Sequence, residues 1–169
     1  MNVSLKACLY VVRTLLCEST QGYASHKYIA IGLLNYLADI LTPSHTSLAN
    51  DLRSVRILIL DDFNTALSLL DALLDSSTTT VTVPFTPMQR DACYDCCIKH
   101  LTTAAVYSLS NNSDASIANL IEALNEAPES TDNYIKTAIT DLIRDPSSIS
   151  VNIWGLIEVV DAERTKNGM

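Results

Sequence analysis

One apolar stripe, longer than an average globular helix, constrains this chain most. Between residues 47 and 75 hydrophobic side chains keep near-helical spacing over roughly seven turns, whereas an average globular helix has about three. The stripe consists of Leu48, Leu52, Val55, Ile59, Ala66, Leu67, Leu70, Leu73 and Leu74. Asp61 and Asp62 could cap a new helix within it, but the stripe keeps its phase through Phe63. We therefore expect one helix here, with at most a kink.

A second stripe follows a break in the pattern and predicts the return arm of a hairpin. Residues 76–80 are all serine or threonine, and the β-branched run 78–83 is expected to be extended. At residues 86–89, Thr86 can cap a helix, Pro87 suits its first turn and Gln89 can complete a capping box. We predict a helical hairpin with arms at roughly 47–75 and 87–109. Such a hairpin carries more apolar surface than it can bury on itself, so another surface must cover the rest.

The remaining sequence also predicts helices joined by short connections. The 169 residues include only four glycines, and all five prolines lie between apolar segments. This distribution is typical of an all-α protein and not of a β-sandwich or a nucleotide-binding α/β sheet. Apolar periodicity predicts further helices over about 5–19, 26–42, 114–127, 131–145 and 150–168. The fold class is therefore all-α, with about seven helices organised on the long hairpin.

Charge and cysteine usage restrict the classes of partner. The net charge is −8 and the eleven basic residues are scattered, so the chain as written is a poor ligand for nucleic acid. No run reaches the roughly 18 to 20 apolar residues of a membrane span. The apolar segment 3–17 is interrupted by Lys6 and Arg13 and lacks a small-residue cleavage site, so we expect a soluble, unprocessed protein. Five cysteines, an odd number on predicted helices, favour a reduced intracellular setting.

The sharpest candidate for chemistry is a cluster formed by Cys93, Cys96, Cys97 and His100. At about 100° per residue, all four fall within roughly a third of a helix circumference and could face one metal ion. Structural zinc, however, usually takes four ligands from two separated segments. Buried free cysteine behaves as a small hydrophobe, and Cys93 and Cys97 fall on the apolar stripe. We favour packing as their role over a metal or redox site, and predict no metal and no cofactor.

The chain shows no catalytic motif. It has no G-x-S-x-G, no H-E-x-x-H, no P-loop and no dinucleotide glycine pattern. Adjacent Asp61 and Asp62 would point about 100° apart on a helix, which does not build a pair of catalytic carboxylates. Trp154 is expected to be a core or interface anchor. We predict that the chain is not an enzyme and has no catalytic residues.

The order of elements and one local pattern carry a resemblance to a known family. Tyr36 is followed by Thr42-Pro43-Ser44-His45 and then by Leu52-Arg53-Ser54-Val55. This resembles the tyrosine, Ser-Pro-x-His and Leu-Arg pattern at the join between the second and third helices of hepadnavirus core (capsid) proteins. The resemblance covers residues 1 to about 128, the assembly domain of that family. The family's arginine-rich tail and the tryptophans of its hairpin have no counterpart here.

The resemblance implies a viral capsid (core) structural protein that self-assembles into a shell. Two protomers would pair their hairpins as a four-helix bundle, and the protein would be found in the virion and in the cytoplasm or nucleus of the host cell. Residues 1–128 would form the helical assembly domain, and 129–169 a two-helix extension or arm. Nucleic acid would bind only through a basic tail that this sequence does not contain.

The surplus of apolar surface and the resemblance point to the same dimer interface, a two-fold contact between hairpins. The predicted dimer-interface residues are Val55, Ile59, Phe63, Leu67, Leu70, Leu74, Cys93, Tyr94, Cys97 and Leu101. The predicted contacts between dimers are Leu120, Leu124, Pro128 and Tyr134. Such contacts are individually weak and multiplied by symmetry.

An alternative from another class is a monomeric helical protein-interaction module, similar to the viral apoptosis inhibitors that hold a partner helix in a groove. Its features are the acidity, an apolar helix over 93–107, and Asn152-Ile153-Trp154-Gly155, which resembles that family's Asn-Trp-Gly-Arg motif. The tetrapeptide lacks the arginine and follows the central helix instead of preceding it. This reading predicts binding of an amphipathic peptide and no assembly.

Overall fold

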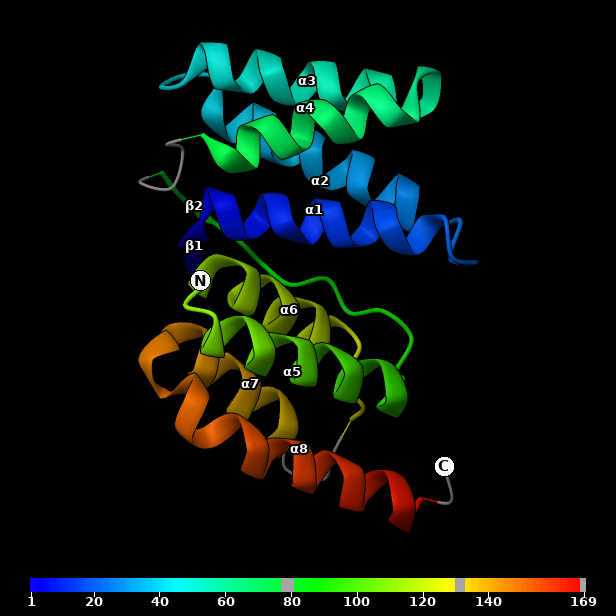
Figure 1. Ribbon diagram of the computed structural model, residues 1–169, viewed down its shortest axis with the longest axis vertical. Helices are drawn as coiled ribbons and strands as arrows, with labels where there is room; N and C mark the ends of the chain where they lie inside the picture. Colours follow the sequence, from blue (N-terminus) through cyan, green and yellow to red (C-terminus); the bar gives the residue numbers. More distant parts are fainter. Residues whose placement is uncertain (77–80, 130–132, 168–169) are drawn as a thin grey trace. The chain divides into compact units, whose positions relative to one another are not determined.

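The computed structural model describes residues 1–76, 81–129 and 133–167, and most of these are helical (Figure 1). Within the described residues there are eight α-helices, a short 3-10 helix and one pair of three-residue strands. The prediction of an all-α protein is confirmed. The chain divides into two compact units, an N-terminal unit of Asn2–Pro84 and a C-terminal unit of Phe85–Met169 together with Met1. The predicted division after Pro128 falls inside the C-terminal unit.

Four helices build the N-terminal unit. They are α1 (Leu5–Ser19), α2 (His26–Leu41), α3 (Thr46–Asp61) and α4 (Phe63–Asp75). α2 packs against α1 and α3, and α4 folds back along α3 and reaches α1 (Figure 1). Leucines fill the interior because the apolar stripes of the helices face one another. The core includes Leu9, Leu15, Leu16, Leu34, Leu37, Leu52 and Leu70.

The prediction of one helix over 47–75 is wrong at Asp62. The backbone of Asp62 (φ −151°, ψ 84°) lies outside the helical region, so α3 ends before it and α4 begins after it. Its carboxylate accepts the backbone N–H of Thr65 at 3.3 Å and the Thr65 hydroxyl at 2.6 Å, which is an N-cap. The apolar pattern did not reveal the break because buried residues continue on both sides of it, with Ile59 in α3 and Ala66 in α4.

A two-stranded ribbon joins the two ends of the N-terminal unit. β1 (Asn2–Ser4) pairs antiparallel with β2 (Thr82–Pro84), with Val3 opposite Val83. The expected extended run over 78–83 is confirmed at Thr82 and Val83, and residues 77–80 lie outside the described residues.

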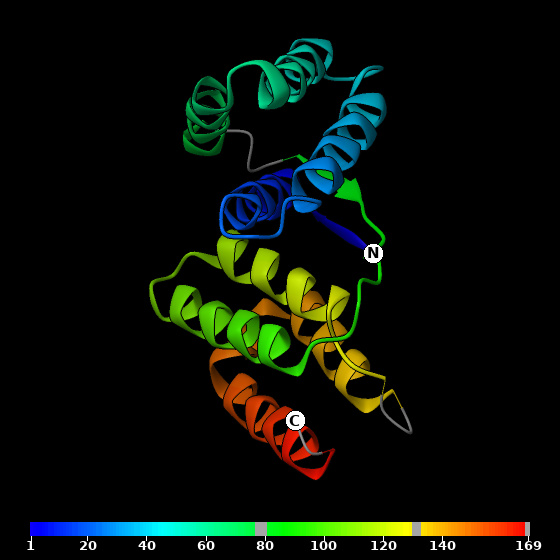
Figure 2. The ribbon, with the colours of Figure 1, turned by 90° about the vertical axis from the view of Figure 1, so that its right-hand side faces the viewer.

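The C-terminal unit is built on a different helical pair from the one expected. α5 (Tyr94–Leu109) folds back on α6 (Ser113–Asn125), α8 (Ile149–Lys166) packs on α5, and α7 (Tyr134–Arg144) packs on α6 and α8 (Figure 2). The short 3-10 helix η2 (Pro146–Ser148) precedes α8. The main partners of α5 are therefore α6 and α8, and the hairpin of 47–75 with 87–109 is not a feature of either unit.

The predicted helix start at residues 86–89 is also wrong, because α5 begins at Tyr94. Residues 85–93 run without helical structure beside the end of α6. The backbone N–H of Arg90 donates to the carbonyl of Asn125 at 2.8 Å, and that of Cys93 to the carbonyl of Glu126 at 3.0 Å. Carbonyls in the last turn of a helix lack partners within the helix, so they hold the 85–93 segment extended.

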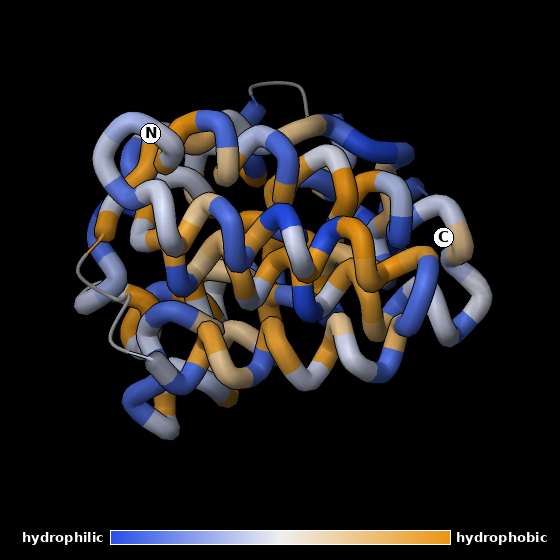
Figure 3. The backbone as a smooth tube through the Cα atoms, turned by 90° about the horizontal axis from the view of Figure 1, so that it is seen from above, coloured by the Kyte–Doolittle hydropathy of each residue, from blue (hydrophilic) through white to orange (hydrophobic). Residues whose placement is uncertain are grey.

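Hydropathy along the backbone alternates within each helix and is not concentrated in one long apolar segment (Figure 3). Among the residues that the structure describes, no helix is both long enough and apolar enough to cross a lipid bilayer.

Candidate functional site

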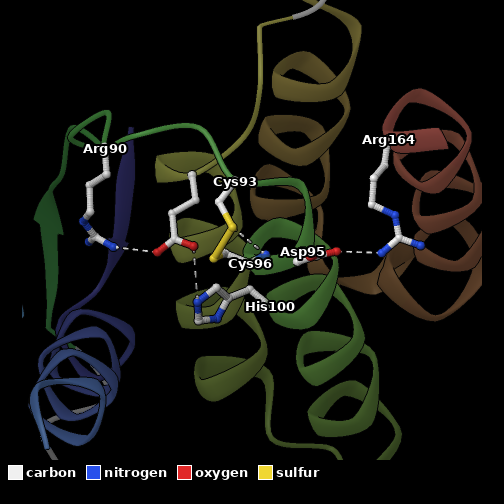
Figure 4. Close-up of a disulfide and its surroundings, with 7 residues drawn as sticks. Arg90, Cys93, Asp95, Cys96, His100 and Arg164 are labelled. Atoms are coloured by element: carbon white, nitrogen blue, oxygen red, sulfur yellow. Dashed lines mark hydrogen bonds and ion pairs between the residues drawn. A yellow bond between two sulfur atoms is a disulfide. The ribbon is translucent and has the colours of Figure 1, made fainter. Parts of the chain in front are cut away.

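The structure joins Cys93 and Cys96 in a disulfide at the start of α5 (Figure 4). Two residues separate the cysteines, and their Cα atoms are 5.2 Å apart, within the usual range for a disulfide. Both cysteines are half-buried. The chain therefore presents a half-buried Cys-x-x-Cys pair at a helix terminus.

Cys93 is the N-cap residue of α5. Its backbone is extended (φ −147°, ψ 110°), and its Sγ accepts the backbone N–H of Cys96 at 3.1 Å. The N-terminus of a helix carries a partial positive charge that stabilises a thiolate and lowers the pKa of a cysteine placed there. Cys93 occupies this position in α5.

Buried charges fix the segment that leads to Cys93. The guanidinium of Arg90 donates to both carboxylate oxygens of Glu122, with N–O distances of 2.6 and 2.8 Å, and to Glu126 at 3.3 Å. The side chain of Glu122 is 0% exposed and that of Glu126 is 7% exposed. Buried carboxylates need such a counter-charge, so the 85–93 segment and α6 are joined by charge as well as by backbone hydrogen bonds.

His100 lies one turn beyond Cys96 on α5 and is 3% exposed. Its Nδ1 is 3.2 Å from Oδ1 of Asn119, and its Nε2 is 3.9 Å from a carboxylate oxygen of Glu126. The Asn119 amide nitrogen donates to the carbonyl of Ala115, so its Oδ1 is the atom that faces His100. Figure 4 shows the imidazole beside the same turns of α5 that carry the disulfide.

The two residues between the cysteines are held by the last turn of α8. Arg164 donates from Nη1 to the carboxylate of Asp95 at 2.6 Å, and it also pairs with Asp161 (Figure 4). Asn167 donates to the phenol oxygen of Tyr94 at 3.0 Å. The hydrogen bond to Asp95 is the main cause that raises the pKa of Arg164, so the guanidinium stays charged throughout the working range.

Cys97, a third residue of the predicted metal cluster, is more deeply buried than Cys93 and Cys96. Cys97 is fully buried, and burial raises the pKa of its thiol to about 12, which keeps it protonated. Cys93 and Cys96 share a disulfide and offer no thiolate in this oxidation state. The cluster thus contains a half-buried cysteine pair and a core thiol, a distinction that helical spacing alone did not make.

The predicted interface residues lie in two separate units and mostly in their cores. Val55, Ile59, Leu70, Leu74, Tyr94, Cys97 and Leu101 are buried, and Phe63, Leu67 and Cys93 are half-buried. Of the predicted contacts between dimers, Leu120 and Pro128 are buried, Leu124 is half-buried and Tyr134 is exposed. A dimer built on the buried side chains would have to reopen packing within a single chain.

No family model matches the chain, and no curated protein or solved structure matches it either. The resemblance to hepadnavirus core proteins therefore stays a prediction from the sequence.

Proposed function

We propose that this protein is a thiol–disulfide exchange protein whose reactive pair is Cys93 and Cys96. One observation carries the proposal: the disulfide lies at the N-cap of α5, where Cys93 Sγ accepts the N–H of Cys96. Reactive cysteine pairs need a stabilised thiolate and access to a partner, and this position supplies both. The proposal departs from the expectation that the cysteines serve only in packing.

The exchange reaction balances with a dithiol as the reductant. A thiolate of the partner attacks Sγ of Cys93, forms a mixed disulfide and releases Cys96 as a thiolate, which takes up a proton. The partner's second thiolate then attacks the partner's first sulfur, which is bonded to Cys93 in the mixed disulfide. This step closes the partner's disulfide and releases the Cys93 thiolate at the helix N-terminus. Two electrons pass from the partner, which becomes a disulfide, to the protein, which becomes a dithiol. The reverse sequence oxidises the reduced protein with a disulfide partner.

The surroundings support repeated opening and closing of this bond. The 85–93 segment fixes Cys93 on the end of α6, whereas Cys96 belongs to the first turn of α5. The Cys93 backbone N–H donates to the carbonyl of Glu126, and the Cys96 backbone N–H donates to Cys93 Sγ, so backbone hydrogen bonds hold the two cysteines near each other. Such a pair is pre-organised for re-oxidation.

The test is equilibration of the purified protein in glutathione buffers of graded potential, followed by alkylation of free thiols and mass spectrometry. We expect a reversible two-electron transition at Cys93 and Cys96. Cys96→Ser should accumulate a mixed disulfide with glutathione on Cys93, whereas Cys93→Ser should accumulate much less on Cys96. Cys17→Ser is the matched control, since Cys17 is an exposed free cysteine, and it should leave the transition unchanged. A pair that never re-oxidises, or glutathione found only on Cys17, would refute the proposal.

A second candidate is assembly of copies of this chain into a dimer and then a shell, the capsid function implied by the resemblance. It is favoured by two apolar side chains one turn apart on α3, Ile57 and Leu60, which are 53% and 59% exposed. α3 belongs to the arm that the sequence assigns to the dimer contact. In a virus, such a protein would be found in the virion and in the host cell.

Sedimentation and electron microscopy at raised protein and salt concentration test this second candidate. Association that Ile57→Ser and Leu60→Ser weaken, with uniform particles, would support a capsid protein. A monomer under all conditions contradicts it, and a monomer that binds an amphipathic peptide would favour the groove-binding module instead.

A further inference from the structure

The dipeptide inside the Cys-x-x-Cys pair is contacted from the far end of the sequence. Arg164 reaches Asp95 at 2.6 Å and Asn167 reaches Tyr94 at 3.0 Å, and both donors belong to the end of α8. Nothing in the cysteine pair itself requires a second helix at this point. The contact places one positive charge beside the only residues that separate the two sulfurs.

Asp95 is the acidic residue in the first turn of α5, between the two cysteines in the sequence. Its carboxylate lies in the first turn of α5, next to Cys96 in sequence, and a nearby negative charge raises the free energy of a thiolate. Arg164 neutralises that carboxylate through a charge-assisted hydrogen bond. From this geometry we infer that Arg164 is a positioning residue for the redox pair, which offsets the charge of Asp95 and so sets how readily Cys93 ionises. This inference rests on the proposed function.

Other charged groups surround the pair and have to be separated from this effect. They are Arg90 of the 85–93 segment, Glu122 and Glu126 of α6, His100 of α5, and Asp161 of α8. Arg90 is bound to both glutamates of α6, which couples those three charges to one another. Asp161 shares Arg164 with Asp95, so removal of Arg164 leaves both carboxylates without this partner.

The ion pair between Asp95 and Arg164 is partly exposed, so the effect of Arg164 on the cysteines should depend on salt concentration. The side chain of Asp95 is 81% exposed and that of Arg164 is 33% exposed, so dissolved salt screens their interaction. The buried contacts of Arg90 are screened much less. Any effect of Arg164 on the cysteines should therefore fall as ionic strength rises, whereas an effect of altered packing should not.

The experiment measures the pH dependence of iodoacetamide alkylation of reduced Cys93, with the peptide resolved by mass spectrometry. At low salt, Arg164→Gln should move the midpoint upward by roughly 0.5 to 1 pH unit, and Asp95→Asn should move it downward. In the Asp95→Asn background, Arg164→Gln should have a smaller effect. Arg164→Lys retains the charge and should restore most of the wild-type profile. Lys166→Gln removes a basic residue from the same last turn and should leave the midpoint unchanged.

The outcomes separate this inference from the function on which it rests. If the wild-type pair does not cycle between disulfide and dithiol, the proposed function fails. If the wild type cycles but Arg164→Gln keeps the wild-type midpoint at low salt, only the inference fails. A shift of equal size in Lys166→Gln, or one that persists in 0.5 M salt, would also overturn it. Circular dichroism of each variant shows whether the fold is retained, and Arg164→Lys tests the charge should Arg164→Gln unfold.

Discussion

Replacing Arg90 with methionine tests whether the buried ion pair holds the 85–93 segment in place. Methionine keeps much of the length of the arginine side chain and removes its charge. The side chain of Arg90 is 13% exposed and that of Glu122 is 0% exposed, so the change leaves a buried carboxylate without this counter-charge. Removing one partner of a buried pair costs about 3–5 kcal/mol of the free energy of unfolding.

The contrast with an exposed pair gives this prediction its control. Arg13 donates to Asp71 at 2.9 Å, but the Asp71 side chain is 51% exposed, and exposed ion pairs contribute about 0–1 kcal/mol. Arg13→Met should therefore cost much less than Arg90→Met. For a chain of this size, about 3 kcal/mol corresponds to a fall in Tm of roughly 6 to 12 °C.

Urea denaturation followed by circular dichroism measures the free energy of unfolding of both variants. The double change Arg90→Met with Glu122→Leu should recover part of the loss, because it removes one of the two buried carboxylates that pair with Arg90. Equal and small losses in Arg90→Met and Arg13→Met would refute the reasoning. So would a double variant that is less stable than Arg90→Met alone.

Three further predictions concern single residues. The Thr65 hydroxyl and N–H lower the pKa of Asp62, so its N-cap stabilisation is present above the unfolded pKa of aspartate and lost as pH falls through the lower folded pKa. Asp62→Ala should thus lower the urea midpoint at pH 7 more than Asp61→Ala, and the difference should vanish in acid. Leu101 is fully buried, so Leu101→Ala should lower the free energy of unfolding by about 2–5 kcal/mol. Leu109 is 69% exposed, so Leu109→Ala should change the free energy of unfolding by no more than about 0.5 kcal/mol. Cys97, with a thiol pKa raised to about 12 by burial, should resist iodoacetamide at pH 8 until urea is added.

The helical content could be predicted from the sequence because periodicity is a local property. The buried residues of α1 and α2 repeat at helical spacing, and the predicted ends near Ser19 and Thr42 lie close to the observed ones. The break at Asp62 could not be predicted in the same way. A one-residue interruption leaves the apolar phase almost unchanged, so the two helices are distinguished by the non-helical backbone of Asp62 and its side-chain cap to Thr65.

The start of α5 depended on contacts distant in the sequence. Residues 86–89 have the composition of a capping box, yet the carbonyls at the end of α6 hold the 85–93 segment out of the helix. Because α5 begins at Tyr94, Cys93 is the N-cap residue of this helix and not a core residue inside it. The spacing of Cys93 and Cys96 was visible in the sequence, but their role followed from this placement.

The apolar stripes also left open which surface would cover them. An apolar stripe indicates which surface of a helix must be buried. It does not indicate whether another helix of the same chain or a second copy of the chain packs on that surface. In this structure Ile59 and Leu70 are covered within one chain. The dimer contact therefore remains a prediction, carried by exposed Ile57 and Leu60 and not by the core of the stripe.

The contact between Asp95 and Arg164 spans 69 residues of sequence, and this separation has a consequence during synthesis. Chains are synthesised from the N-terminus at about 5–20 residues per second, so the cysteines are made several seconds before Arg164. A nascent chain would meet oxidants with Asp95 uncompensated and its thiols less reactive. The finished chain alone would carry the neutralised pair, so the order of synthesis itself would delay the onset of its reactivity.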